Sequence, residues 1–223
     1  MTTSGAQAHG APDTGGRIEP ADFRAAVQSL HEATVRPELE VGSIRPPQRL
    51  APYSYALGVE VDQPDTADAG TIAADSAGSA FGRLVLLYDP DGHEAWNGTF
   101  RLVAFIQAEL EASLATDQML PQVAWSWLTD ALGVPEGGTE SVPPADSDVP
   151  AVRALGGTVT STTSVRFGDI AGPPQAHQLE MRASWTPTNP SLTGHLEAFC
   201  EVLASVAGLP PAGVSDLGAL GRR

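Results

Sequence analysis

The segment LLYDPDGHEAWNGTF, residues 86–100, holds the densest group of side chains in this chain that could do chemistry. Its carboxylates could bind a hard cation such as Ca²⁺, which prefers several oxygen ligands from one short segment. Its imidazole could move a proton if a carboxylate held it in place. The candidate residues for a ligand or a partner in this segment are Asp89, Asp91, His93, Glu94 and Trp96.

The spacing in this segment favours a turn over a metal site. An EF-hand loop needs glycine at its sixth position and glutamate at its twelfth. Counted from Asp89, the glycine is fourth and the twelfth residue is Phe100. Asp-Pro-Asp-Gly suits a type I turn, because the first Asp bonds the backbone and Gly92 accepts a positive φ. Adjacent residues on an extended chain point apart, so His93 and Glu94 form a poor acid–base pair. The sequence predicts a structural turn and no metal.

Catalytic motifs are missing elsewhere in the sequence. There is no G-x-S-x-G, H-E-x-x-H or G-x-G-x-x-G pattern. All twelve basic residues are arginine, so P-loop proteins, pyridoxal-phosphate enzymes and kinases, which need a lysine, are excluded. The single cysteine, Cys200, falls on an apolar helical stripe between Leu196 and Leu203 and is predicted to be buried and inert. His195 is expected at the edge of that stripe. No catalytic residue and no cofactor are predicted.

The charge balance indicates which partners the chain would avoid. Twelve basic and 27 acidic residues give a net charge of −15, which repels nucleic acid and anionic membranes. Arg36, Arg45 and Arg49 could form a local basic patch, but solvated or carboxylate-paired arginines are the favoured interpretation. One cysteine, no signal-peptide pattern and no long apolar run predict a cytoplasmic protein without a membrane segment.

We expect one domain over residues 18–208. Residues 1–17 and 209–223 have little apolar periodicity and are predicted to be a disordered and a flexible tail. The stretches 62–80 and 134–150 are acidic and rich in Pro, Gly, Ser or Ala, and we expect mobile surface loops there.

Hydrophobic periodicity predicts eight elements within that domain. Steps of three and four residues predict helices, and strict alternation or short apolar runs predict strands. The expected order is a helix from Pro20 to Arg36, strands at 53–61 and 82–88, helices at 103–114 and 120–133, strands at 156–168 and 178–185, and a helix from Pro190 capped by Asn189. The fold class is therefore α+β, an antiparallel sheet with helices packed on one face. The order is also compatible with a duplicated αββα unit.

The expected helix at 120–133 carries two tryptophans. Trp127 falls inside its apolar arc and is expected in the core, whereas Trp125 lies at the edge and is expected to be half exposed. Trp125 therefore joins the candidate residues for a partner surface.

Several segments together resemble a known family. They are RPE at 36–38, APYSYALGVEV, GRLVLLYDPDGHEAWNGTFRLVAFIQAEL, WSWL, GGTVTSTTSVRFG and LEMRASWTP at 179–187. From about residue 20 to 208 the chain resembles an uncharacterised actinobacterial family, the domain of unknown function three thousand. The resemblance implies an actinobacterial cytoplasmic protein with a compact domain. It supplies no activity and no functional residues.

Two functions from different classes remain open at this point. The first, which the missing motifs favour, is a non-enzymatic binding or adaptor module for a protein partner. The alternative is a small-molecule, hydrolase-like enzyme whose site lies in the loops around 89–96 and 169.

Overall fold

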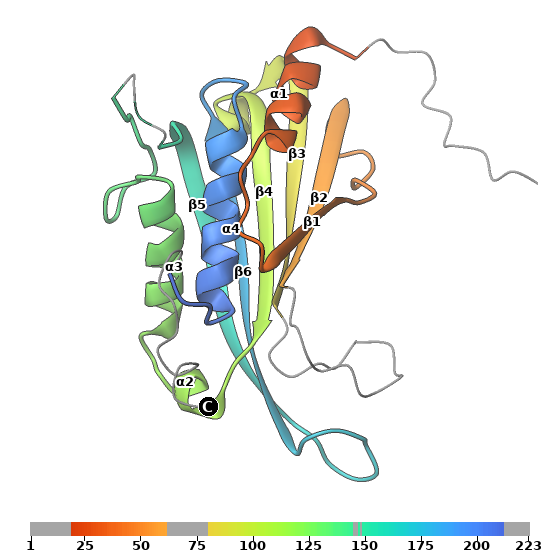
Figure 1. Cartoon of the computed structure of the whole chain (residues 1–223), viewed down its shortest axis with the longest axis vertical. Coiled ribbons are helices and arrows are strands. Elements are labelled where there is room, and N and C mark those ends of the chain that lie inside the picture. Colours follow the sequence, from red (N-terminus) through yellow and green to blue (C-terminus); the bar gives the residue numbers. More distant parts are fainter. Residues whose placement is uncertain (1–18, 62–79, 145–146, 148, 212–223) are drawn as a thin grey trace, which may run out of the picture.

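The computed structural model describes residues 19–61, 80–144, 147 and 149–211 (Figure 1). The predicted tail at 1–17, nearly all of the predicted loop at 62–80 and most of the predicted tail at 209–223 lie outside the described residues. The elements are α1 (Ala21–His31), β1 (Leu39–Ser43), β2 (Tyr53–Val61), β3 (Ala80–His93), the 3₁₀ helix η1 (Glu94–Trp96), β4 (Gly98–Glu109), α2 (Ala112–Ala115), α3 (Leu120–Ala131), β5 (Val152–Val165), β6 (Gln175–Pro187) and α4 (Thr193–Val206).

The fold is α+β, as predicted. The six strands of the described residues form one antiparallel sheet in the order β1-β2-β3-β4-β6-β5. The helices α1, α3 and α4 lie on one face of this sheet, with α4 across its centre (Figure 1). The core fills the space between this face and the helices. No helix in the described part of the chain is long and apolar enough to cross a membrane.

The predicted helix over residues 103–114 is wrong, because residues up to Glu109 form strand β4. Its inward residues Phe100, Leu102 and Ile106 are buried in alternation, and the strand is paired on both sides by β3 and β6. Two full ladders of backbone hydrogen bonds and one buried face outweigh the weak helical propensity of this stretch. Four strands therefore precede α2, so the described elements do not form two αββα units.

One further strand and two helix boundaries differ from the prediction. Strand β1 was not expected, and it pairs with β2 from Leu39 to Ser43. The first helix ends at His31, before the Arg36–Pro37 stop. The last helix begins at Thr193 with no side-chain cap, because the Asn189 side chain instead accepts a hydrogen bond from the Ser191 backbone N–H at 2.9 Å.

Helix α4 supplies the centre of the core. Phe199 is fully buried, and the predicted burial of Cys200 is confirmed. Burial raises the pKa of the Cys200 thiol to about 12, so the reactive thiolate is strongly disfavoured. The expectation that His195 lies at the edge is wrong. This residue is only 2% exposed, and its Nδ1 accepts a hydrogen bond from Trp185 Nε1 at 3.1 Å.

Candidate functional site

The segment after Tyr88 continues strand β3 to His93 with a shifted register, and the chain reverses through η1 and Asn97 before β4. The predicted turn at Asp89–Gly92 is therefore wrong in position, because the reversal lies after His93, although the local bonds expected of these residues are present. The Asp89 Oδ1 accepts a hydrogen bond from the Asp91 backbone N–H at 3.1 Å, and Gly92 has a φ of +77°. The His93 ring stacks on Trp96 with centroids 4.9 Å apart. Among the described residues, no group of three or more His, Cys, Asp or Glu side chains is placed to hold a metal ion. The short-range hydrogen bond and the glycine conformation account for this sequence as turn chemistry.

Replacing Gly92 by valine is expected to lower the free energy of unfolding by about 1–3 kcal/mol, because a β-branched residue resists a positive φ. Chemical denaturation measures the change. The matched control is Gly42→Val, since a Cβ at Gly42 meets no atom within 4 Å. Millimolar Ca²⁺ should not raise the melting temperature of the wild type. A tolerated Gly92→Val, together with Ca²⁺ stabilisation that Asp91→Asn abolishes, would instead establish a metal site.

The two loops of the enzyme alternative lie at opposite ends of the sheet. The segment 89–96 adjoins the start of β4. The end of β4, at Glu109, pairs with Gln178 of β6, and Asp169 lies beyond this end, in the connection between β5 and β6. The 12 residues of β4 span about 40 Å at 3.3 Å per residue. The two loops therefore do not form one site.

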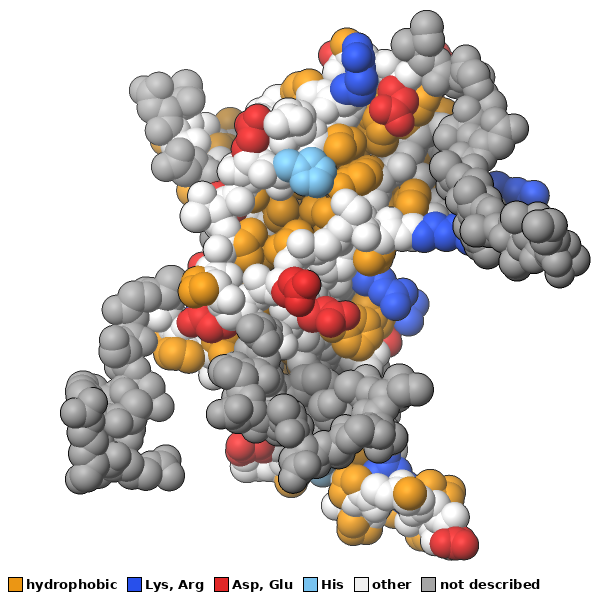
Figure 2. Space-filling view, turned by 45° about the vertical axis from the view of Figure 1, so that its right-hand side comes forward, with side chains coloured by type: hydrophobic (Ala, Val, Ile, Leu, Met, Phe, Trp, Pro, Cys, Tyr) orange, Lys and Arg blue, Asp and Glu red, His pale blue; other side chains and the backbone are white. Residues whose placement is uncertain are grey.

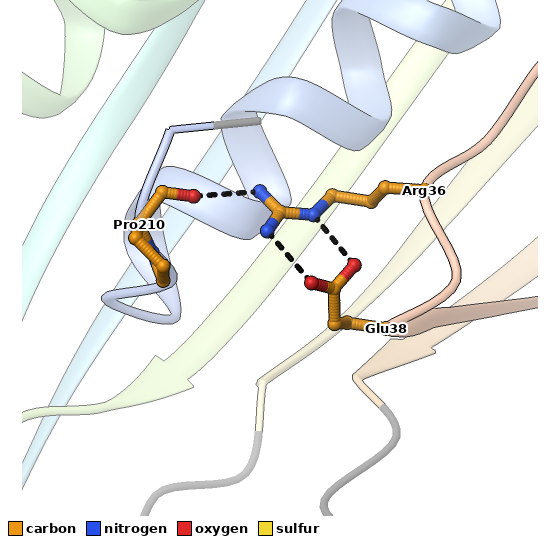
Figure 3. A network of polar contacts seen from close by, with 3 residues as sticks. All are labelled: Arg36, Glu38 and Pro210. Carbon is orange, nitrogen blue, oxygen red and sulfur yellow. Dashed lines mark hydrogen bonds and ion pairs between the residues drawn. The ribbon is translucent and has the colours of Figure 1, made fainter. Parts of the chain in front are cut away.

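The three predicted arginines do not gather in one patch. Arg36 precedes β1 and makes a two-point ion pair with Glu38, with Nε–Oε2 and Nη2–Oε1 distances of 3.1 and 3.2 Å. Its Nη1 also donates to the Pro210 carbonyl at 3.0 Å (Figure 3). The hydrogen bond to Glu38 raises the pKa of Arg36, and the same bond lowers the pKa of Glu38. Arg45 and Arg49 are exposed beyond the other end of β1. Arg36 is thus the carboxylate-paired arginine that the sequence favoured.

The tryptophans of α3 are both partly buried. Trp127 packs against the core without being fully enclosed, so its predicted core position holds only in part. Trp125 lies against strand β5, where a Cβ on Gly157 would approach its Cζ3 to 2.8 Å. Trp125, Gly157 and Val159 line a cleft of about 640 Å³ between α3 and β5. Trp125 and the turn residues therefore belong to different surfaces.

Hydrophobic side chains also gather on the β1–β2 side of the molecule, with charged residues around them (Figure 2). Tyr55 and Val41 on this side are partly buried against the core. The Tyr55 hydroxyl hydrogen-bonds to Ser43 Oγ at 2.5 Å and to His31 Nε2 at 3.0 Å. These bonds tie α1 to β1 and β2, so this area has a structural role.

The sheet face that points away from α1, α3 and α4, called the open face below, carries side chains in an ordered pattern. The strand registers align one row across β2, β3, β4, β6 and β5 together with Ile44, the residue after β1. We call it the apolar row, although it includes the hydroxyl of Ser184. This row consists of Ile44, Ala56, Val85, Val103, Ser184 and Gly156. Val85 and Val103 are only partly buried, and they occupy its centre.

Arginines lie on both sides of the apolar row. The row before it contains Arg83, Phe105 and Arg182 on adjacent strands. The row after it contains Arg101 and Arg153, which flank Thr186. The Arg182 guanidinium lies 5.5 Å from the centre of the Phe105 ring, a distance at which a cation and an aromatic face attract. These are the two arginine rows of the open face.

Arg101 is held in position by neutral groups. Its Nη1 donates to the Ala154 carbonyl at 2.9 Å and to Thr186 Oγ1 at 3.1 Å, and its Nη2 donates to Ser184 Oγ at 2.6 Å. Partial burial lowers the pKa of Arg101. Its guanidinium remains charged at neutral pH, because the ordinary pKa of arginine is above 12.

Within the described part of the chain, only one of these four arginines forms an ion pair with a carboxylate. Arg182 pairs with Glu180 at 2.7 Å, whereas Arg83, Arg101 and Arg153 form no ion pair with described residues. Acidic residues of the open face lie toward one end of the sheet, at Glu40, Glu60 and Glu180 in the row of Phe81 and at Glu109 beyond it. The arginine rows therefore form a positive area on an acidic protein.

Sequence reasoning missed this site. In β4, every second residue points away from the core, and these outward residues include Arg101, Val103 and Phe105. A strand places alternate residues on one face and would have put these three side chains together, but the residues from Val103 onward were assigned to a helix.

Comparison with known proteins places the chain in a family without assigning it an activity. The family model described as "Protein of unknown function (DUF3000)" matches residues 19–215. No curated protein and no solved structure matches the chain. The matched range includes every described element, and the chain therefore belongs to the DUF3000 family.

Proposed function

We propose that the protein is a non-enzymatic binding module that takes an acidic, partly apolar segment of a protein partner on the open face of its sheet. One observation carries the proposal: two arginine rows flank an apolar row on the sheet face that lies away from the long helices. The turn at 89–96 and Asp169 lie too far apart to form one catalytic site, so no enzymatic function is proposed.

The arginine chemistry favours carboxylates as the ligand groups. A guanidinium presents planar donors that match a carboxylate at two points. Arg101 is partly desolvated without a carboxylate partner among the described residues, so an incoming carboxylate gains more there than at a fully hydrated arginine. Val85 and Val103 between the rows offer contact area for apolar side chains of the same segment.

A protein segment fits this face better than nucleic acid or a membrane. The net charge of −15 repels any extended polyanion, and Glu60, Glu109 and Glu180 occupy the neighbouring rows of the same face. A short peptide segment can place its carboxylates beside the arginine rows and avoid the glutamate rows. We also propose a cytoplasmic location in an actinobacterium, on the strength of the single cysteine and the arginine-only basic content.

Charge reversal on the open face tests the proposal. Arg83→Glu changes an exposed arginine of the open face, and Arg24→Glu changes an exposed arginine of α1 by the same charge. Each tagged variant is expressed in the native cell, and quantitative mass spectrometry identifies the proteins that co-purify. We expect Arg83→Glu to lower recovery of a specific partner at least about tenfold, because like charges then face each other, and Arg24→Glu to retain it.

The melting temperatures of both variants serve as the folding control. Equal recovery of every protein with the two variants would contradict binding at the open face. A partner whose recovery falls equally in both variants would mean that only the overall charge matters.

A further inference from the structure

Strand β5 is an edge strand whose second half is free for pairing within the described chain. Its first part is covered, because Val152 bridges to Ser141 and the Leu155 N–H donates to the Thr139 carbonyl at 2.9 Å. From Gly156 to Val165 the strand pairs only with β6. The sequence there is GGTVTSTTSV, which contains no charge and no proline.

The opposite edge of the sheet is built differently. Strand β1 has only five residues, carries Glu40, and is followed by Pro46 and Pro47. Short length, charge and proline are the features by which sheet proteins prevent a further strand from adding to an edge. The uncharged stretch of β5 has none of these features, so it is a template for another strand.

The end of the β5–β6 hairpin exposes large apolar side chains. This hairpin extends beyond the rest of the described molecule (Figure 1). Phe167 is 79% exposed, Ile170 62% and Val165 47%. An exposed phenylalanine at the end of a projecting hairpin is a typical contact residue of an interface.

The cleft beside Trp125 offers a place for such a side chain. It lies where α3 approaches β5 and is lined by Trp125, Gly157 and Val159. Gly157 and Val159 pair with the inward residues Ala183 and Met181, so the cleft lies on the helix-covered face. Residues at odd positions of β5, up to Val165, point to this same face.

We propose that two copies of this chain pair their β5 strands antiparallel about a two-fold axis at Thr162. In this register Thr162 faces its own counterpart, Val159 faces Val165, and Gly157 faces Phe167. The two members of each pair point to the same sheet face, as antiparallel pairing requires: the open face for Thr162, and the helix-covered face for the other two pairs. Phe167 of each copy then enters the Trp125 cleft of the other copy. One symmetric contact thus covers the exposed hairpin end of each copy.

The net charge of the chain supports this edge as the contact. Two copies of −15 each repel, so a stable contact must avoid placing acidic surfaces together. The paired segment 157–167 brings no carboxylate to the interface, and its one charged residue is Arg166. The paired sheets would also place the two open faces side by side, although the dimer does not depend on the function proposed for those faces.

The test measures the mass of the full chain in solution by sedimentation equilibrium at micromolar concentrations. We expect twice the chain mass of 23.1 kDa, with tighter association at about 0.5 M than at 0.05 M salt, because salt screens the repulsion between the copies. Thr162→Lys is expected to yield monomers, since it places two ammonium groups opposite each other. Thr188→Lys is the control, at an exposed position beyond β6.

A second measurement tests the register independently of stability. Facing Cα atoms in an antiparallel pair lie about 4.5–5.5 Å apart, within reach of a disulfide. Thr162→Cys should therefore form a covalent dimer on oxidation, whereas Thr188→Cys should not, and the only other cysteine is buried. Phe167→Ser is expected to weaken dimerisation at least about tenfold. A wild type that stays at 23.1 kDa, a dimer that Thr162→Lys leaves unchanged, or a failure of Thr162→Cys to cross-link would each overturn the proposal.

Discussion

Lowering the pH from 7 to 4 is expected to reduce the free energy of unfolding by about 3 kcal/mol through His195 alone. Burial lowers the pKa of His195 to about 3 in the folded chain, against an ordinary value of 6.5. The side chain is 2% exposed, and its Nδ1 accepts the Trp185 indole N–H at 3.1 Å. The neutral ring is therefore the form that the core accommodates.

The direction of this pH effect follows from proton binding at His195 in the folded and the unfolded chain. Between pH 6.5 and pH 3 the unfolded chain binds a proton at His195 and the folded chain does not. The stability is therefore fully present above pH 6.5 and is lost as the pH falls toward 3. The acidic residues of the chain also titrate in this range, so the contribution of His195 must be isolated as a difference between variants.

His195→Asn provides that difference, because an amide oxygen can accept from Trp185 and does not titrate. Urea denaturation at a series of pH values measures the free energy of unfolding of both proteins. We expect the wild type to be the more stable at pH 7 and to lose about 3 kcal/mol of this advantage by pH 4. His93→Asn, which changes an exposed histidine, is the matched control. An advantage that stays constant with pH would contradict a buried neutral His195.

The fold class was predictable because most elements carry one clear hydrophobic period. Strand β2 alternates between its two faces, and α4 repeats apolar residues every three or four positions. Strand β1 was missed because it has five residues, of which only Leu39 is buried. Its pairing with β2 determines the strand, and such tertiary pairing leaves little trace in so short a sequence.

The error over β4 and the missed open face have the same cause. Val103 and Phe105 point away from the core, yet they are apolar and therefore hide the alternation of Leu102, Ala104 and Ile106. A strand with an apolar outward row lacks the polar positions that identify a half-buried strand. The local bond of Asp89 and the positive φ of Gly92 were predictable, because Asx and glycine chemistry acts within four residues, but the sequence did not indicate that the chain reverses only after His93.

Replacing Gly82 by alanine is expected to destabilise the protein by about 1–3 kcal/mol, although both residues are small. A Cβ built on Gly82 of β3 would lie 2.5 Å from Cζ of Phe199 and 3.1 Å from its Cε1. Phe199 is fully buried in α4, so neither the ring nor the helix can move without opening the core. The absence of a side chain at Gly82 thus sets how closely α4 packs on the centre of the sheet.

A double-mutant cycle separates this steric cause from a loss of strand structure. Phe199→Leu shortens the side chain that meets the new Cβ, so Gly82→Ala should cost at least about 1 kcal/mol less in that background than in the wild type. Gly42→Ala is the control, because a Cβ at that strand position meets no atom within 4 Å and should leave stability nearly unchanged. Equal costs of Gly82→Ala in the two backgrounds would show that contact with Phe199 is not the reason for glycine at this position. Chemical denaturation of the four proteins of the cycle decides between the two causes.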